Sequence, residues 1–201
     1  GAKGLARALP ELDTDDVVEI LEDLNENERN VIIKKLPKTE RILVEEAFTF
    51  PEYSAGRLMQ RDFLAFPEFW TVGQTIDHMR KNIYEEEKNF YSIFIINPKQ
   101  MILGELSLAK LLSNYRSVRL KDIMHSEFQS VNVNTDQEEI ALLFQQYGLV
   151  NLPVIDNEKR VLGVITVDDI VDVINEEAEE DFFGLGGVRD GSIRSSIFEA
   201  L

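Results

Sequence analysis

The stretch Leu152-Pro-Val-Ile155, followed by Val161-Leu-Gly-Val-Ile-Thr-Val-Asp-Asp169, decides the fold of this 201-residue chain. Each part begins with a short apolar run, typical of a buried β-strand, and the turn residues Asp156-Asn157 separate the two runs. Ile170, Val173 and Ile174 then follow at helical spacing. The stretch therefore predicts two neighbouring strands and a helix.

The same pattern occurs earlier in the chain, so the sequence contains an internal repeat. Ile93-Phe-Ile-Ile96 corresponds to the first of the two strands, and Leu103-Gly-Glu-Leu-Ser-Leu108 corresponds to the second. Upstream, residues 58–63 match residues 123–128, and residues 71–76, which lead into a helix, match residues 135–140. Landmarks that register over about 55 to 60 residues predict two β-α-β-β-α units.

The residues before this repeat predict a small all-helical, superhelical domain. Asp13-Thr14 is a candidate N-cap for a first helix, and Asn25-Glu-Asn27 predicts a break before a second helix over residues 29–36. Pro37 favours the start of a third helix, which we expect to continue to about Phe48. The helical domain is expected to end near Phe50-Pro51.

Composition restricts the function. A formal net charge of −16 disfavours binding to nucleic acid or to anionic lipid and favours multivalent cations or basic partners. The chain has no cysteine, which excludes disulfides, thiolate metal sites and cysteine nucleophiles. Apolar runs such as Tyr91 to Ile96 are much shorter than the roughly 20 residues of a membrane span.

The stretch from Asp168 to Asp181 is rich in carboxylates and has no basic residue. On a helix, four of these acids fall at spacings of three or four and share one face: Asp169, Asp172, Glu176 and Glu180. Like charges at this spacing repel one another. Two interpretations are open. The carboxylates bind a cation that offsets the repulsion, or they form a solvated acidic face that keeps the protein soluble.

The repeat resembles a tandem pair of CBS domains. The resemblance rests on the β-α-β-β-α pattern, on Leu152-Pro153-Val154, and on residues 163–169 at the turn from strand to helix. CBS pairs form a pseudo-two-fold module with clefts between the repeats, and they usually bind regulatory ligands rather than catalyse reactions. The sequence offers no catalytic base with an orienting partner, so we predict that the protein is not an enzyme.

A wider resemblance covers nearly the whole chain. Residues 54–59, 136–139, 152–154, 166–172 and 176–181, behind a helical domain, are similar to the cytosolic part of the MgtE family of magnesium channels. The resemblance implies an α+β protein with a helical N-terminal domain (1–52), a first CBS repeat (55–118), a second CBS repeat (119–178), and a linker (179–201) towards a connecting helix and a transmembrane pore domain.

The family resemblance also implies a mechanism. We expect a homodimer at the cytoplasmic face of the cell membrane, in which Mg²⁺ between acidic surfaces closes the domains and shuts the pore for magnesium transport. When Mg²⁺ is scarce, the acidic surfaces repel and the pore opens. Scattered carboxylates suit this ion, which binds oxygen ligands and keeps several waters.

Matched by motif, the family's metal ligands fall on eight carboxylates of this chain: Asp15, Glu19, Glu138, Asp169, Asp172, Glu177, Glu180 and Asp181. For the first two, the alternative is an ordinary acidic first turn that complements the helix dipole. Gly148, near Gln145, stands where relatives can carry an acid, so a site there is expected to be weaker or missing.

The alternative ligand is an adenine nucleotide. CBS clefts often hold nucleotides with a Ser or Thr followed three residues later by Asp, and the second repeat has Thr166 and Asp169. In the first repeat Ser107 is present, but Lys110 replaces the Asp and cannot accept hydrogen bonds from a ribose. The alternative function is therefore a nucleotide-sensing CBS regulator of another effector.

Overall fold

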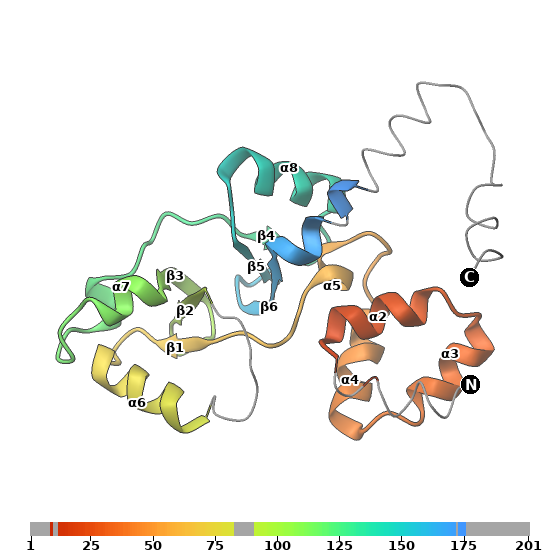
Figure 1. The fold of residues 1–201 in the computed structure, drawn as a ribbon, viewed down its shortest axis with the longest axis horizontal. Coiled ribbons are helices and arrows are strands. Elements are labelled where there is room, and N and C mark those ends of the chain that lie inside the picture. The colour runs from red at the N-terminus through yellow and green to blue at the C-terminus, as the bar shows by residue number, and fades with distance from the viewer. Residues whose placement is uncertain (1–8, 10–11, 83–90, 172, 176–201) are drawn as a thin grey trace, which may run out of the picture.

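The computed structural model describes residues 9, 12–82, 91–171 and 173–175, and its N-terminal helices form a domain of their own (Figure 1). The helices are α2 (Thr14–Glu22), α3 (Glu26–Ile33) and α4 (Lys38–Ala47). They enclose a core of Leu9, Val17, Leu21, Ile32, Ile33, Leu36 and Val44. The predicted helical domain is confirmed.

The predicted break between the first two helices is shorter than we expected. Asn25 is the N-cap of α3, and its side-chain oxygen accepts a hydrogen bond from the backbone N–H of Glu28 at 3.0 Å. An N-cap side chain satisfies one of the amides that have no partner within the helix. The helix therefore begins at Glu26, and not at Arg29 as the sequence suggested.

Two three-stranded sheets follow, one for each repeat. The first unit contains β1 (Ala65–Pro67), α6 (Val72–Asn82), β2 (Ser92–Ile96), β3 (Ile102–Ser107) and α7 (Leu108–Leu112). The second unit contains β4 (Val131–Asn132), α8 (Gln137–Tyr147), β5 (Asn151–Ile155), β6 (Val161–Thr166) and helical residues at 167–171 and 173–175. In each sheet the first strand pairs parallel to the second, and the second pairs antiparallel to the third. The predicted pair of β-α-β-β-α units is confirmed.

The two repeats exchange their leading segments. The short helix α5 (Ala55–Leu58) precedes the first repeat, yet Ala55 and Met59 are buried in the core of the second sheet. Correspondingly, the 3₁₀ helix η2 (Leu120–Asp122) precedes the second repeat, yet Leu120 is buried in the core of the first sheet. The exchange ties each repeat to the other.

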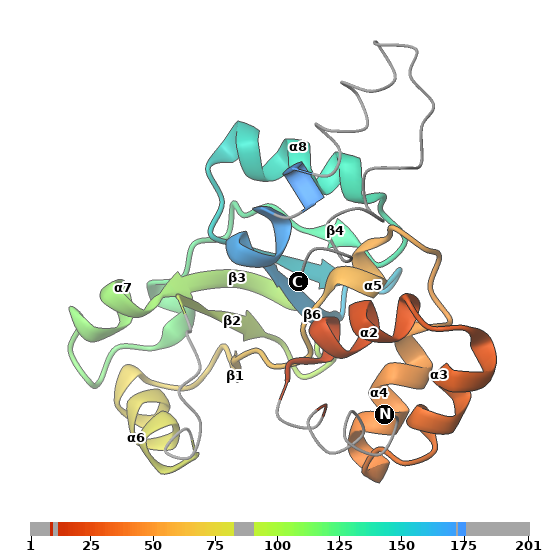
Figure 2. The same ribbon diagram turned by 45° about the vertical axis from the view of Figure 1, so that its right-hand side comes forward.

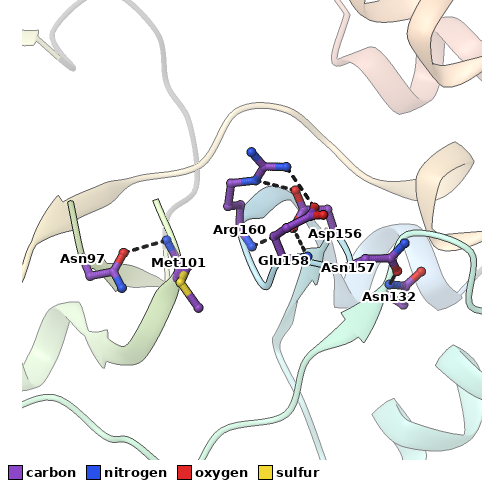
Figure 3. Close-up of polar contacts among 7 residues, drawn as sticks. All are labelled: Asn97, Met101, Asn132, Asp156, Asn157, Glu158 and Arg160. Carbon is purple, nitrogen blue, oxygen red and sulfur yellow. Dashed lines mark hydrogen bonds and ion pairs between the residues drawn. The ribbon is translucent and has the colours of Figure 1, made fainter. Parts of the chain in front are cut away.

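The two sheets also contact one another directly. Phe94, Ile96, Val161 and Val164 form a buried cluster that includes residues from both sheets. Beside it, the β2–β3 and β5–β6 turns exchange two backbone hydrogen bonds, from Ile102 N to Lys159 O at 3.1 Å and from Val161 N to Gln100 O at 3.3 Å. Figure 3 shows polar side chains bracing both turns, including Asn97 on the backbone of Met101 and Asp156 on Arg160. The sheets therefore form one module.

The helical domain lies beside the second sheet unit. Figure 2 shows α2 next to α5 and β6, away from α6 of the first unit. No helix within the described ranges is long and apolar enough to cross a membrane. The predicted linker at 179–201 lies outside the described residues.

Gly148 has a structural reason to be glycine. It caps the C-terminus of α8 in the left-handed conformation, with φ 60° and ψ 42°, and its N–H donates to Phe144 O. A Cβ at this position would meet nothing within 4 Å, so the restriction comes from the backbone conformation alone.

We predict that Gly148→Ala lowers the free energy of unfolding by about 1 kcal/mol, since a left-handed conformation disfavours residues with a Cβ. Gly148→Asn should cost less, because asparagine tolerates this conformation. Urea unfolding followed by circular dichroism measures both variants. Equal stability of the alanine variant and the original protein would contradict the capping role.

Candidate metal and domain-docking site

Asp169 lies at the turn from β6 to the last helical residues, and its carboxylate is held by three hydrogen bonds. Its Oδ2 accepts from Thr166 Oγ1 at 2.5 Å, from Gln60 Nε2 at 2.8 Å and from the backbone N–H of Thr166 at 3.3 Å. The last of these bonds resembles a capping box, with Asp in place of Glu. All three bonds end on Oδ2, so within the described part of the chain Oδ1 has no hydrogen bond.

Gln60 takes part because the exchanged segment passes close to β6. Its backbone forms a bridge with Val164, with N–H···O distances of 2.8 and 3.0 Å. Gly163 permits this approach, since a Cβ there would lie 2.5 Å from Gln60 O. Gln60 falls on one of the repeat's landmarks, but nothing in the local sequence marks it as a site residue.

Asp15 lies in the first turn of α2 and is largely withdrawn from water. Its Oδ1 is buried and has no hydrogen-bond partner among the described residues. The pKa of Asp15 is raised to about 8. Burial is the largest cause, and the negative charges of Asp169, Asp16 and Asp13 contribute the rest. A carboxylate in such surroundings requires either a proton or a cation.

Asp15 and Asp169 therefore interact as like charges across the boundary between the helical domain and the second sheet unit. Burial also raises the pKa of Asp169, while the hydrogen bonds from Thr166 and Gln60 oppose that increase and Asp168 adds to it. Two acidic groups from different domains, one with an unpaired buried oxygen, are suited to share a hard cation.

The other predicted ligands do not complete this pair. Glu19 is exposed on α2, and Glu138 is exposed in the first turn of α8. No group of three or more acidic or histidine side chains within the described ranges is arranged to hold a metal ion. Four further predicted ligands lie outside the residues whose side chains are described: Asp172, Glu177, Glu180 and Asp181.

The nucleotide motif differs between the two repeats. In the second repeat, the hydroxyl of Thr166 donates a hydrogen bond to Asp169, so the two side chains of the motif bind each other. In the first repeat, Ser107 Oγ accepts from the backbone N–H of Lys110 at 3.2 Å and serves as the N-cap of α7. The carboxylate is found in the second repeat only, as the sequence predicts.

Comparison with known proteins identifies the family. A model described as the MgtE intracellular N domain matches residues 1–53, and a CBS domain model matches residues 120–176. A crystal structure described as the cytosolic domain of the Mg²⁺ channel MgtE in complex with ATP superposes with a TM-score of 0.78 at 32% identity, over 84% of this chain and 69% of that one. The chain belongs to the MgtE family.

Other relatives agree with this assignment. The crystal structure of the soluble part of a magnesium transporter superposes with a TM-score of 0.80 at 28% identity, covering 86% of this chain and 67% of that chain. The magnesium transporters MgtE of Thermus thermophilus and Bacillus subtilis are 37% and 29% identical over 76% and 87% of this chain. The chain spans 33% and 39% of their lengths, so it corresponds to a part of these proteins.

We predict that, without divalent cations, stability falls as pH rises. The pKa of Asp15 is about 8 in the folded protein and about 4 in an unfolded chain, so the folded state retains a proton that the unfolded state releases between these values. Asp15→Asn should remove much of this slope and stabilise the protein at pH 8 by roughly 2 kcal/mol. Urea unfolding in chelator between pH 5 and pH 8 measures the effect.

Asp16→Asn is the control, because Asp16 is exposed on the same helix. It should leave most of the slope in place. A pH dependence that is the same in Asp15→Asn and in the original protein would show that Asp15 titrates normally.

Proposed function

We propose that this part of an MgtE-family protein is the Mg²⁺-sensing gate of a magnesium channel, located at the cytoplasmic face of the membrane. The proposal rests on the electrostatic interaction between Asp15 and Asp169, because each comes from a different domain and Asp15 Oδ1 is buried without a partner among the described residues. A divalent cation between them would change a repulsive contact into an attractive one.

Asp15 and Asp169 are suited to a weak, switchable site. Mg²⁺ often binds to one or two carboxylates and completes its coordination with water. A site of this kind releases its ion when the concentration falls. Asp15 then either takes up a proton or, as a carboxylate, repels Asp169, and in both cases the attraction supplied by the ion between the helical domain and the second sheet unit is lost. Further carboxylates, Asp172, Glu177, Glu180 and Asp181, are proposed to add sites towards the connecting helix, with Glu19 and Glu138 as peripheral ligands.

The proposed output is closure of a pore formed by a transmembrane domain of the same protein. Two copies of the chain are proposed to assemble as a homodimer, so that closing the helical domains fixes the distance between the two connecting helices. Each site contributes only its differential affinity for the closed state, and several sites acting on one motion give a steep response.

We predict that Mg²⁺ raises the melting temperature at constant ionic strength, and that Asp15→Asn removes much of this gain. At ten times its dissociation constant, one ion adds about 1.4 kcal/mol to the stability of the folded state, which is roughly 3 to 6 °C for a chain of this size. Differential scanning calorimetry with Mg²⁺ or chelator, balanced with KCl, measures the gain.

Asp16→Asn keeps the same net charge as Asp15→Asn and serves as the matched control, since its side chain is exposed. It should retain the gain in melting temperature. An equal response to Mg²⁺ in the two variants would exclude Asp15 as a ligand, and no response in the original protein would exclude the sensor.

A nucleotide-sensing module is the second candidate. It is favoured by the connected Thr166 and Asp169 side chains and by the similarity to a cytosolic MgtE domain whose structure contains ATP. The same calorimetric experiment separates the two functions when ATP replaces Mg²⁺ in the presence of chelator. Stabilisation by ATP alone, lost in Thr166→Val, would favour the second candidate.

A further inference from the structure

Arg57 connects α5 to the helical domain through three contacts. Its guanidinium forms an ion pair with Glu22 at the end of α2. Its Nε donates to Phe50 O at 3.0 Å, and its Cζ lies 4.6 Å from the centre of the Phe48 ring. Only 10% of the side chain is exposed, so water screens these contacts weakly.

Arg61, four residues further along the chain and beyond the end of α5, joins the helical domain to the second sheet. Its Nη1 donates to Leu162 O on β6 at 3.0 Å, and its Nη2 lies 3.1 Å from Glu46 Oε2 on α4. The contact with Glu46 is an ion pair without the geometry of a directed hydrogen bond. The side chain is 11% exposed.

Both arginines belong to a segment that is fixed to the second sheet unit. Ala55 and Met59 are buried in the core of that unit, and Gln60 forms a backbone bridge with β6. The two guanidinium groups therefore extend from the second sheet unit to carboxylates of the helical domain. They act across the same boundary as the repulsion between Asp15 and Asp169, with the opposite sign.

We infer that Arg57 and Arg61 are positioning residues for the Asp15–Asp169 pair. They add an attraction between the helical domain and the second sheet unit that does not depend on a cation, and so set the cation concentration at which the domain closes. The statement that the two arginines set this cation concentration rests on the proposed function. Arginine suits the task because its planar fork binds carboxylates, carbonyls and ring faces at the same time.

The lack of cysteine makes the domain position directly measurable. Asn30 on α3 and Glu139 on α8 are exposed and lie on the two units, so Asn30→Cys with Glu139→Cys accepts one spin label on each. Pulsed electron paramagnetic resonance then gives the distribution of distances between the labels. Dilution with unlabelled protein suppresses distances between copies, and samples are measured in chelator and over a Mg²⁺ titration.

The test variant is Arg57→Gln with Arg61→Gln, and its control is Arg29→Gln with Arg41→Gln. The control removes the same charge from within the helical domain, where Arg29 lies 4.7 Å from the same Phe48 ring and Arg41 pairs with Glu45 on α4. In chelator, the closed distance population should be smaller in the test variant than in the control. Its Mg²⁺ midpoint should rise about fivefold or more.

A second double variant tests the same ion pairs from the acidic side. The direction in which it shifts the open–closed equilibrium distinguishes loss of the pairs from a general change in charge. Glu22→Gln with Glu46→Gln removes two acids from the helical domain. If general acidic repulsion governed the boundary, this change would favour closure, whereas loss of the arginine pairs favours opening. Glu26→Gln with Glu45→Gln is its control, because Glu26 and Glu45 are exposed on α3 and α4, and Glu45 pairs within α4.

The inference is overturned if both test variants show the same distance distributions in chelator as their controls. Failure of the proposed function gives a different result. In that case Mg²⁺ leaves the distances of the original protein unchanged, while the arginine variants still open the domain in chelator.

Discussion

Asp15 and Asp169 repel one another across the boundary between the helical domain and the second sheet unit when both are ionised, and the position of the helical domain depends on how this repulsion is offset. Burial strengthens this repulsion, since a charge that is withdrawn from water is screened weakly. A proton, a cation or a change in the distance between the domains each relieves it. A boundary of this kind can respond to the concentration of a divalent cation.

The exchange of leading segments gives this boundary its geometry. The chain leaves the helical domain, enters the core of the second sheet unit with Ala55 and Met59, and only then begins the first repeat. As a result Arg57, Gln60 and Arg61 follow one another at the junction of the two units. Gln60 orients the carboxylate of Asp169, and the two arginines contact the helical domain.

The two repeats share a backbone but differ in their chemistry. His125 in the first unit takes the place that Gln60 takes in the second, with a backbone bridge to Glu105 in one and to Val164 in the other. Where the second unit has Asp169, the first has Lys110. The acidic docking position therefore exists in the second unit alone, which is also the unit that α2 adjoins.

The repeat was predictable because strand periodicity and turn residues are local signals that occur twice. The same is true of the position of Asp169 at the end of a strand. The exchange of segments was not predictable from the pattern, since Ala55 and Met59 would be apolar against either sheet. Gln60 and Arg61 lie on a landmark of the repeat, but nothing local marks them or Arg57 as site residues. Asp15 and Asp169 were expected as ligands through the family resemblance, which did not pair them.

We expect Asp15 and Asp169 to be drawn together when Mg²⁺ is present and to move apart when it is removed. Small-angle X-ray scattering of this chain with Mg²⁺ and with chelator, at matched ionic strength, tests it most directly. The account predicts a smaller radius of gyration in Mg²⁺, and a difference that disappears when Asp15 and Asp169 are both replaced by Asn. Identical scattering profiles across millimolar Mg²⁺ would contradict it.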